Sequence, residues 1–184
     1  MSALLKPSSN ITPSDYLAGE LTSEVRHEYV DGLVYAMSGA SVGHSRMVNR
    51  VRRVLESANG GKPCEVFVLD IKVQINATNS YYYPDVVLTC EPVADDSYVI
   101  DAPCLIVEVT SPTTEATDRR EKLRAYQTLP TLKDYWIVNP NEAAVECWQR
   151  TPQGWAVQYA TAADSLHVSC LQADITLQSL YAAE

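Results

Sequence analysis

The sequence predicts an α/β protein with a mixed central β-sheet flanked by helices. Three observations support this class: an amphipathic helical pattern over residues 41–58, a nearly all-apolar run over 103–110, and successive strand patterns over 134–139, 143–150 and 154–160. The apolar run is typical of a strand buried in the middle of a sheet. The helical pattern provides one apolar stripe that can cover such a sheet.

The length and composition predict one domain spanning residues 1–184. The 184 residues are 46% hydrophobic and 20% charged, which is close to the globular average and excludes wholesale disorder. A chain of this size buries roughly 70% of its unfolded surface, so it can form a core without covalent staples. No internal repeat or low-complexity tract interrupts the sequence.

Turn and capping signals predict the elements near the start of the chain. Residues 12–21 are expected to form a short helix, because Thr12 can cap it and Pro13 suits its first position. Residues 27–38 are expected to form a strand pair around the turn signal Asp31-Gly32.

Periodicity predicts the remaining elements. Alternation of apolar residues indicates one strand over 64–76 and another over 81–90. A charged helix is expected over 114–128, and the alternating tail, 165–182, is expected to add one more strand.

No targeting or membrane segment is expected, and we place the chain in the cytoplasm. Residues 1–10 lack the pattern of a signal peptide, and no window approaches 18 uncharged apolar residues. The cysteines are odd in number, widely spaced and without a C-x-x-C pair: Cys64, Cys90, Cys104, Cys147 and Cys170. We therefore expect buried thiols rather than a disulfide framework or a structural zinc site.

The charge distribution is uneven. A net charge of −9 and a pI near 4.8 argue against broad, non-specific coating of nucleic acid. Two basic clusters depart from this average: Arg46, Arg50, Arg52 and Arg53 form the first, and Arg119, Arg120, Lys122 and Arg124 form the second. Each cluster is either a solvated helix face or a contact surface for phosphates.

Two acidic residues occupy unusual places in the predicted strands. Glu108 lies within Leu-Ile-Val-Glu-Val, where a carboxylate is costly to bury unless it is paired or binds a metal ion. Asp85 follows Pro84 and begins the apolar run of an earlier strand. Adjacent strands lie about 4.8 Å apart, so both carboxylates can converge on one Mg²⁺, which prefers few carboxylates together with waters and phosphate oxygens.

A lysine on the predicted charged helix completes this set. Asp118, Lys122, Ala125 and Leu129 share one helical stripe, and its two apolar members favour an inward face. An inward Lys122 could polarise the attacking water or stabilise charge that grows on a phosphate. The alternatives are an exposed Lys122 paired with Asp118 at i,i+4 spacing, or the use of Lys72 in its place.

An ordered set of short motifs resembles one protein family. The motifs are Tyr83-Pro84-Asp85-Val86-Val87, Ile106-Val107-Glu108-Val109-Thr110-Ser111-Pro112, the segment from Asp118 through Lys122 to Tyr126, Asp134-Tyr135-Trp136-Ile137-Val138, and the upstream segment from His27 to Ser38. The set is similar to the restriction-endonuclease-like proteins of the PD-(D/E)XK superfamily that are expanded in some photosynthetic bacteria, a Uma-type domain of unknown function. The resemblance covers residues 12–182, and His44 matches the family's histidine.

The resemblance implies a restriction-endonuclease-like fold and a metal-dependent phosphodiesterase site. Asp85, Glu108 and the main-chain carbonyl of Val109 would hold Mg²⁺ or Mn²⁺, and Glu28 would be a further acid near the metal. The lysine that the superfamily places two residues after Glu108 is Thr110 here, so Lys122 would supply that function.

The resemblance also implies an endonuclease that acts on nucleic acid, with DNA as the expected substrate. The expected contacts to nucleic acid are His44, Arg46, Arg50 and Arg119. A homodimer is expected, because one small nuclease domain cuts one strand and a duplex needs two sites.

Each candidate has a structural alternative. Asp85 could simply follow a turn and cap a strand, Glu108 could pair with a structural cation, and Glu28 could be a surface acid. His44 is expected at the core or helix start rather than in catalysis. The run Tyr81-Tyr82-Tyr83 is expected on a strand surface, with base stacking as the alternative.

Two other functions remain open from the sequence. The first is a catalytically inactive nuclease fold that binds nucleic acid or a protein partner, which Thr110 and the acidic pI favour. The second is an enzyme that acts on a small phosphorylated substrate.

Overall fold

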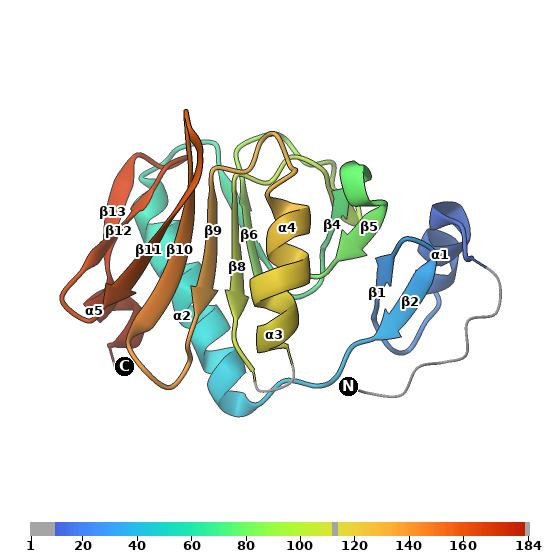
Figure 1. Ribbon diagram of the computed structural model, residues 1–184, viewed down its shortest axis with the longest axis horizontal. Helices are drawn as coiled ribbons and strands as arrows, with labels where there is room; N and C mark the ends of the chain where they lie inside the picture. The colour runs from blue at the N-terminus through green and yellow to red at the C-terminus, as the bar shows by residue number, and fades with distance from the viewer. Residues whose placement is uncertain (1–9, 112–113, 183–184) are drawn as a thin grey trace.

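The computed structural model describes residues 10–111 and 114–182, which form two β-sheets, a β-ribbon and flanking helices (Figure 1). The six-stranded sheet consists, in spatial order, of β11 (Gly154–Thr161), β10 (Ala144–Thr151), β9 (Asp134–Val138), β8 (Leu105–Val109), β6 (Val86–Thr89) and β3 (Glu65–Val68). The five-stranded sheet consists of β2 (Leu33–Ala36), β1 (His27–Val30), β5 (Ser80–Tyr82), β4 (Lys72–Ile75) and β7 (Val99–Ile100). The ribbon is formed by β12 (Ser165–Val168) and β13 (Ala173–Thr176). The predicted α/β class is confirmed, with several sheets where the sequence predicted one.

The apolar strand predicted over 103–110 lies inside the six-stranded sheet. It is β8, whose five residues are all buried between the antiparallel strand β6 and the parallel strand β9. Its side chains alternate between two cores. Leu105, Val107 and Val109 belong to one hydrophobic cluster, whereas Ile106 belongs to the other. Glu108 therefore points to the same side as Ile106.

Two helical segments cover the opposite faces of this sheet (Figure 1). The long helix α2 (Val42–Asn59) packs Met47, Val48, Val51 and Leu55 into the first cluster, as its periodicity predicts. Ser41 caps its start, and Gly60 ends it in the left-handed conformation with φ +59°. The second segment consists of α3 (Glu115–Thr117), the π-helical turn η2 (Asp118–Lys122) and α4 (Leu123–Tyr126), and it packs on the face toward which Glu108 points.

The N-terminal elements agree with the sequence prediction. The helix α1 (Pro13–Glu20) begins after Thr12, whose side chain accepts a hydrogen bond of 3.1 Å from the Asp15 backbone N–H. The strands β1 and β2 form the predicted hairpin around Asp31 and Gly32, which adopt positive φ angles of 45° and 91°. This hairpin places Glu28 beside the β5–β6 connection, where its Oε1 accepts a hydrogen bond of 3.4 Å from the backbone N–H of Tyr83.

Three strand predictions are wrong in their boundaries. The single strand over 64–76 is divided into β3 and β4, which belong to different sheets, and the chain turns at Leu69 with φ +60°. The single strand over 81–90 is likewise divided into β5 and β6. The tail forms two strands and the helix α5 (Leu177–Tyr181) where one strand was expected. An alternating pattern continues unchanged through a sharp corner between sheets, so the alternation alone cannot reveal the corner.

The expected environment of the tyrosine run is also wrong. Tyr81, Tyr82 and Tyr83 are 4%, 1% and 5% exposed, so they are core residues rather than strand-surface residues. Tyr81 packs with Tyr16 and Tyr29 in a small aromatic cluster. Their rings are not exposed in a way that would permit stacking on a base.

The prediction of free thiols is wrong for four of the five cysteines. Disulfides join Cys64 to Cys90 and Cys104 to Cys170, and Cys147 remains a buried thiol. The bonded residues are 26 and 66 positions apart in the sequence, so spacing gave no sign of the pairing. In the described ranges, no helix is both long and apolar enough to cross a membrane.

Candidate active site

Asp85 and Glu108 lie at the same edge of the six-stranded sheet. The strands β6 and β8 are antiparallel, and Val86 pairs with Val107. Asp85 directly precedes Val86, and Glu108 directly follows Val107, so the register places these two acids opposite each other. The edge lies beside the start of α2 and under the α3–η2–α4 segment (Figure 1).

The Glu108 carboxylate is buried and hydrogen-bonded by two side chains of the covering helix. It is 3% exposed, and its Oε1 accepts hydrogen bonds from Lys122 Nζ at 3.2 Å and from Tyr126 Oη at 2.9 Å. Burial raises the pKa of Glu108 well above its ordinary value; Lys122 opposes this rise, and the nearby carboxylates add to it. Glu108 is therefore an acid that needs a cation in order to remain ionised.

Lys122 is the buried cation of this site. Its side chain is 6% exposed, and its Nζ lies 2.8 Å from Glu28 Oε1, 3.2 Å from Glu108 Oε1 and 3.6 Å from Asp118 Oδ1. Burial by itself disfavours the ammonium, but Glu108, Glu28 and Asp118 together raise the pKa of Lys122 well above its ordinary value. One ammonium thus bridges carboxylates from β1, β8 and the π-helical turn.

Asp118 adds negative charge that this lysine does not balance. It is 1% exposed, its Oδ1 lies 3.6 Å from Lys122 Nζ, and neither carboxylate oxygen accepts a short hydrogen bond from residues 10–111 or 114–182. Burial raises the pKa of Asp118, although Lys122 lowers it. Buried carboxylate oxygens without a hydrogen bond are expensive, so the site has the capacity to accept a further cation or proton.

Asp85 forms a second group with His44 and Val109. Its Oδ2 accepts a hydrogen bond of 2.7 Å from the Val109 backbone N–H and lies 3.1 Å from His44 Nε2. Hydrogen bonding to Asp85 raises the pKa of His44 although burial opposes this, and the Val109 backbone adds to the rise. His44 lies in the first turn of α2, where Ser41 caps the helix through the His44 N–H.

The donor chemistry of the site fits a hard divalent cation, although the side chains are not arranged around one. Oxygen donors from Glu28, Glu108 and Asp118 face a single lysine, and Asp85 pairs with His44 beside them. The Asp118 oxygens accept no short hydrogen bond from the part of the chain that the structure describes. Carboxylate oxygens are the ligands that Mg²⁺ and Mn²⁺ prefer. Within residues 10–111 and 114–182, however, no three His, Cys, Asp or Glu side chains surround one point as a metal site. The Lys122 ammonium instead lies among the carboxylates.

The structure gathers most of the site residues that the sequence singled out. Glu28, Asp85, Glu108, Val109 and Lys122 lie at this edge, together with His44. Sequence reasoning gave no role to Asp118 beyond pairing with Lys122, and none to Tyr126. Their spacing carried a usable signal, because residues 118, 122 and 126 follow one another at i,i+4 steps on one helical stripe.

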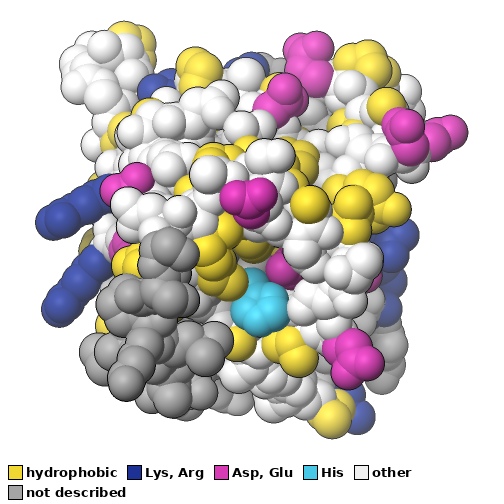
Figure 2. All heavy atoms as spheres, turned by 90° about the vertical axis from the view of Figure 1, so that its right-hand side faces the viewer, with side chains coloured by type: hydrophobic (Ala, Val, Ile, Leu, Met, Phe, Trp, Pro, Cys, Tyr) yellow, Lys and Arg dark blue, Asp and Glu magenta, His cyan; other side chains and the backbone are white. Residues whose placement is uncertain are grey.

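The other candidates lie elsewhere or are already paired. Arg46 is exposed and Arg50 half-buried on α2, whereas Arg119 forms ion pairs with Glu115 and Glu146. Lys72 does not join Glu108: its Nζ donates a hydrogen bond of 3.1 Å to Tyr83 Oη, and burial lowers its pKa. On the face that Figure 2 shows, acidic side chains are scattered over the middle, and Lys and Arg project mainly at the margins. That face therefore offers no continuous basic surface.

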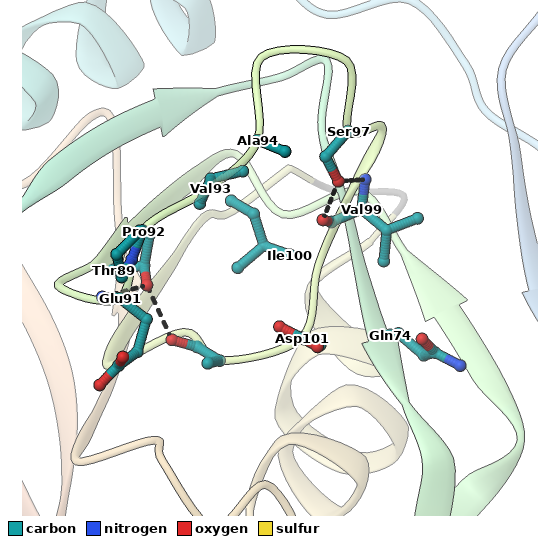
Figure 3. A pocket seen from close by; sticks show the side chains of 11 residues that line it. Gln74, Thr89, Glu91, Pro92, Val93, Ala94, Ser97, Val99, Ile100 and Asp101 are labelled. Carbon is teal, nitrogen blue, oxygen red and sulfur yellow. Dashed lines mark hydrogen bonds between the residues drawn. The ribbon is translucent and has the colours of Figure 1, made fainter.

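A cavity away from this edge is lined by two exposed carboxylates, Glu91 and Asp101, but by no Lys, Arg or His. It has a volume of about 320 Å³ and lies between β4, β7 and the segment from Thr89 to Ala102 (Figure 3). Its hydroxyl groups are committed to the backbone, since Ser97 Oγ donates to the Val99 carbonyl and Thr89 Oγ1 donates to the Ala102 carbonyl. The carboxylate–lysine cluster is therefore the better candidate for an active site.

Comparisons with known proteins identify the family and the fold of the chain. The sequence model of the family Uma2, described as "Putative restriction endonuclease", matches residues 13–179. Two uncharacterized proteins of Synechocystis are similar: slr1290 is 35% identical over 95% of this chain and 93% of its own length, and sll1609 is 31% identical over 76% and 81%. A crystal structure from Anabaena variabilis, described as a "putative nuclease belonging to DUF820", has a TM-score of 0.75 at 16% identity and covers 93% of this chain and 97% of that one. The fold is thus that of a nuclease-like α/β protein.

Proposed function

The chain belongs to the Uma2 family of restriction-endonuclease-like proteins, and from this premise we propose that it hydrolyses phosphodiester bonds in nucleic acid with the help of Mg²⁺ or Mn²⁺. DNA is the proposed substrate. The observation that carries the proposal is Lys122, which is buried and lies within 4 Å of carboxylates on three separate elements. A solitary structural ion pair would not need so many buried acids, because each costs desolvation energy.

In this proposal some residues would hold the metal ion, and Lys122 would stabilise negative charge on the phosphate. Asp85 and Glu108 would hold the metal with the Val109 carbonyl, and Glu28 would be a further acid beside it. The ion supplies, when bound, activation of the attacking water and neutralisation of the scissile phosphate. Lys122 would place its positive charge beside the phosphate oxygens, which carry more charge in the transition state.

The position of Lys122 supports its use in place of the lysine that Thr110 replaces. Its ammonium contacts the Glu108 carboxylate from the helix above the strand, at 3.2 Å. Lys122 therefore reaches the Glu108 carboxylate from the helix and does not need to stand at the position of Thr110 after the strand. The Lys122 ammonium would thus lie beside a phosphate bound at these carboxylates and stabilise its negative charge.

Cleavage of single- and double-stranded nucleic acids in Mn²⁺ or Mg²⁺ tests the proposal. The variants Asp85→Asn and Glu108→Gln remove ligands, and Lys122→Met removes the ammonium. Each should reduce cleavage at least about 100-fold, in line with the loss of one strong electrostatic group. Arg124→Met is the matched control, because Arg124 is exposed on the same helix. The proposal fails if the folded wild-type protein does not cleave, or if the three variants cleave as well as the control.

A catalytically inactive nuclease fold is the second candidate, and two observations favour it. The ammonium of Lys122 is fully engaged by carboxylates, and Arg119, an expected phosphate contact, is neutralised by Glu115 and Glu146. Such a protein would bind nucleic acid or a protein partner without cutting. Salt-dependent retention of DNA without cleavage in Mn²⁺ would support this candidate over the enzyme.

We propose a homodimer only for the case in which the protein cleaves nucleic acid. Two copies of the site would be needed for cutting both strands of a duplex. Light scattering coupled to gel filtration measures the oligomeric state. The ratio of nicked to linear product from a supercoiled plasmid shows whether both strands are cut together. The two measurements together test the homodimer separately from the nuclease activity.

A further inference from the structure

A second cluster of chemically reactive side chains lies at the opposite edge of the same sheet. Cys90 follows the end of β6 and Cys104 precedes the start of β8, whereas Asp85 and Glu108 lie at the other ends of these strands. Cys64 immediately precedes β3, and Cys170 follows β12. The two disulfides that these four cysteines form touch each other, because Cys90 Sγ lies 3.9 Å from Cys104 Sγ.

We propose that the reduced form of this four-cysteine cluster (Cys64, Cys90, Cys104 and Cys170) binds one zinc ion or another soft divalent metal as a closed, tetrahedral, structural site. In the oxidised arrangement that the structure shows, the sulfurs are bonded in pairs, and no group of three potential ligands holds a metal among the described residues. The proposal therefore concerns the four thiols that remain when both disulfides are reduced.

The distance between the disulfides matches a zinc site. Zinc–sulfur bonds of about 2.3 Å in a tetrahedron separate neighbouring sulfurs by roughly 3.8 Å. The 3.9 Å between Cys90 Sγ and Cys104 Sγ already equals one edge of that tetrahedron. After reduction, the two sulfurs of each former disulfide would need to move apart to the sulfur–sulfur distance of the tetrahedron. Small side-chain rotations can provide this movement.

Hydrogen bonds hold the segments around Cys64, Cys104 and Cys170 in place independently of the disulfides. The Cys104 N–H donates to the Leu88 carbonyl at 2.8 Å, so β6 and β8 remain paired beside the cluster. The Cys64 carbonyl accepts a hydrogen bond of 3.0 Å from the Asn59 side chain at the end of α2. The backbone N–H of Ser169, next to Cys170, donates to Asp134 at 2.8 Å. These contacts keep the thiols together when the S–S bonds are broken.

The surroundings also favour metal binding by thiolates. Cys64 and Cys104 are 9% and 7% exposed, and Cys90 and Cys170 are half-buried, so the cluster is shielded but reachable. Each disulfide takes two electrons from a dithiol, which becomes a disulfide itself, and two protons to yield two thiols. Each thiol that binds zinc then loses its proton to the solvent as the Zn–S bond forms. A zinc tetrathiolate would replace the cross-links among β3, β6, β8 and the β12–β13 turn.

Titration of zinc and cobalt into anaerobic protein, reduced with a phosphine that does not compete for the metal, tests the proposal. We expect one tightly bound zinc per chain, and with cobalt the intense visible bands and the near-ultraviolet sulfur-to-cobalt band of a tetrahedral thiolate site. Cys104→Ser should weaken zinc binding at least about 100-fold, because even changes outside the ligand shell cost about 10- to 100-fold. Cys147→Ser should leave binding unchanged, since Cys147 is a separate buried thiol.

Two further sets of variants are titrated with zinc in the same way. The Asp85→Asn/Glu108→Gln variant should bind zinc at the cysteines as the wild-type protein does, which separates this site from the proposed catalytic metal. Cys64→Ser/Cys90→Ser, which retains the Cys104–Cys170 pair, provides a second ligand variant if Cys104→Ser does not fold. The proposal is overturned if reduced protein with a native circular dichroism spectrum and four accessible thiols binds zinc no better than these ligand variants.

Discussion

Replacement of Lys122 by methionine should destabilise the protein strongly, and the loss should depend on pH. Methionine keeps most of the side-chain volume but removes the ammonium, which lies 2.8, 3.2 and 3.6 Å from Glu28, Glu108 and Asp118. Removal of one partner from a buried ion pair costs about 3–5 kcal/mol, because it leaves uncompensated buried charge. We expect a loss in this range at pH 8.

The sign of the pH dependence follows from Glu108. Burial raises its pKa in the folded protein above the value in the unfolded chain, and removal of Lys122, which opposes this rise, would raise the pKa further. A carboxyl group with a raised folded pKa stabilises the folded state at low pH, and this contribution is lost as the pH rises from the unfolded pKa through the folded one. Each pH unit in this window changes the free energy of unfolding by about 1.4 kcal/mol for one proton. The variant should therefore lose less stability at pH 6 than at pH 8.

Urea denaturation of the wild type, Lys122→Met and Arg124→Met at pH 6 and pH 8, with the disulfides in the same state, measures these quantities. Arg124→Met should change the free energy of unfolding by no more than about 0.5 kcal/mol at either pH, because Arg124 is exposed. A loss below about 1 kcal/mol for Lys122→Met at pH 8, or an equal loss at both pH values, would refute the assignment of Lys122 as the cation that keeps the buried carboxylates ionised.

Three further predictions concern other parts of the chain. Asp134→Ala should lower the free energy of unfolding by about 3 kcal/mol in urea denaturation, because it leaves the Ser169 N–H, the Ser169 hydroxyl and a glutamine amide without their buried acceptor; a loss under 1 kcal/mol would contradict this. Gly60→Ala should cost about 1 kcal/mol and Gly60→Asn less, since φ is +59° at this helix end, and equal stability of both variants and the wild type would argue against it. If the chain binds DNA, Arg50→Ala should reduce the salt slope of binding by about one, whereas Arg119→Ala should leave it unchanged because Glu115 and Glu146 already neutralise this arginine; a change in the slope of Arg119→Ala alone would reverse these assignments.

Local signals in the sequence were sufficient for most helices and for the strands β8, β9, β10 and β11. The cap at Thr12 acts within one helical turn, so neighbouring residues reveal it. The strand β8 was recognisable because a strand buried on both faces needs an apolar side chain at nearly every position. Glu108 was conspicuous for the same reason, as the exception within that run.

The cysteine cluster was hidden because its proximity depends on the topology of the sheet. Cys64 and Cys90 come together because β3 pairs with β6, and Cys104 joins them because β8 pairs with the other side of β6. Each of these pairings is set by the whole sheet rather than by the residues around a cysteine. Rules based on short spacing, such as C-x-x-C, detect only clusters that one turn can form.

The geometry of the candidate active site depends most on the two corners that the sequence did not reveal. At Leu69 and again at Tyr83-Pro84-Asp85 the chain passes from one sheet to the other, although the apolar alternation continues. The second corner places Asp85 at the start of β6, opposite Glu108. In the middle of a longer strand, its side chain would instead lie among the side chains of the neighbouring strands. The same corner brings the Tyr83 N–H to Glu28, which ties the five-stranded sheet to the site. The π-helical turn then brings Asp118 and Lys122 over this junction. The site is therefore formed by the joining of two sheets and a wide helical turn, whereas Asp85, Glu108 and Lys122 could be identified by their chemistry alone.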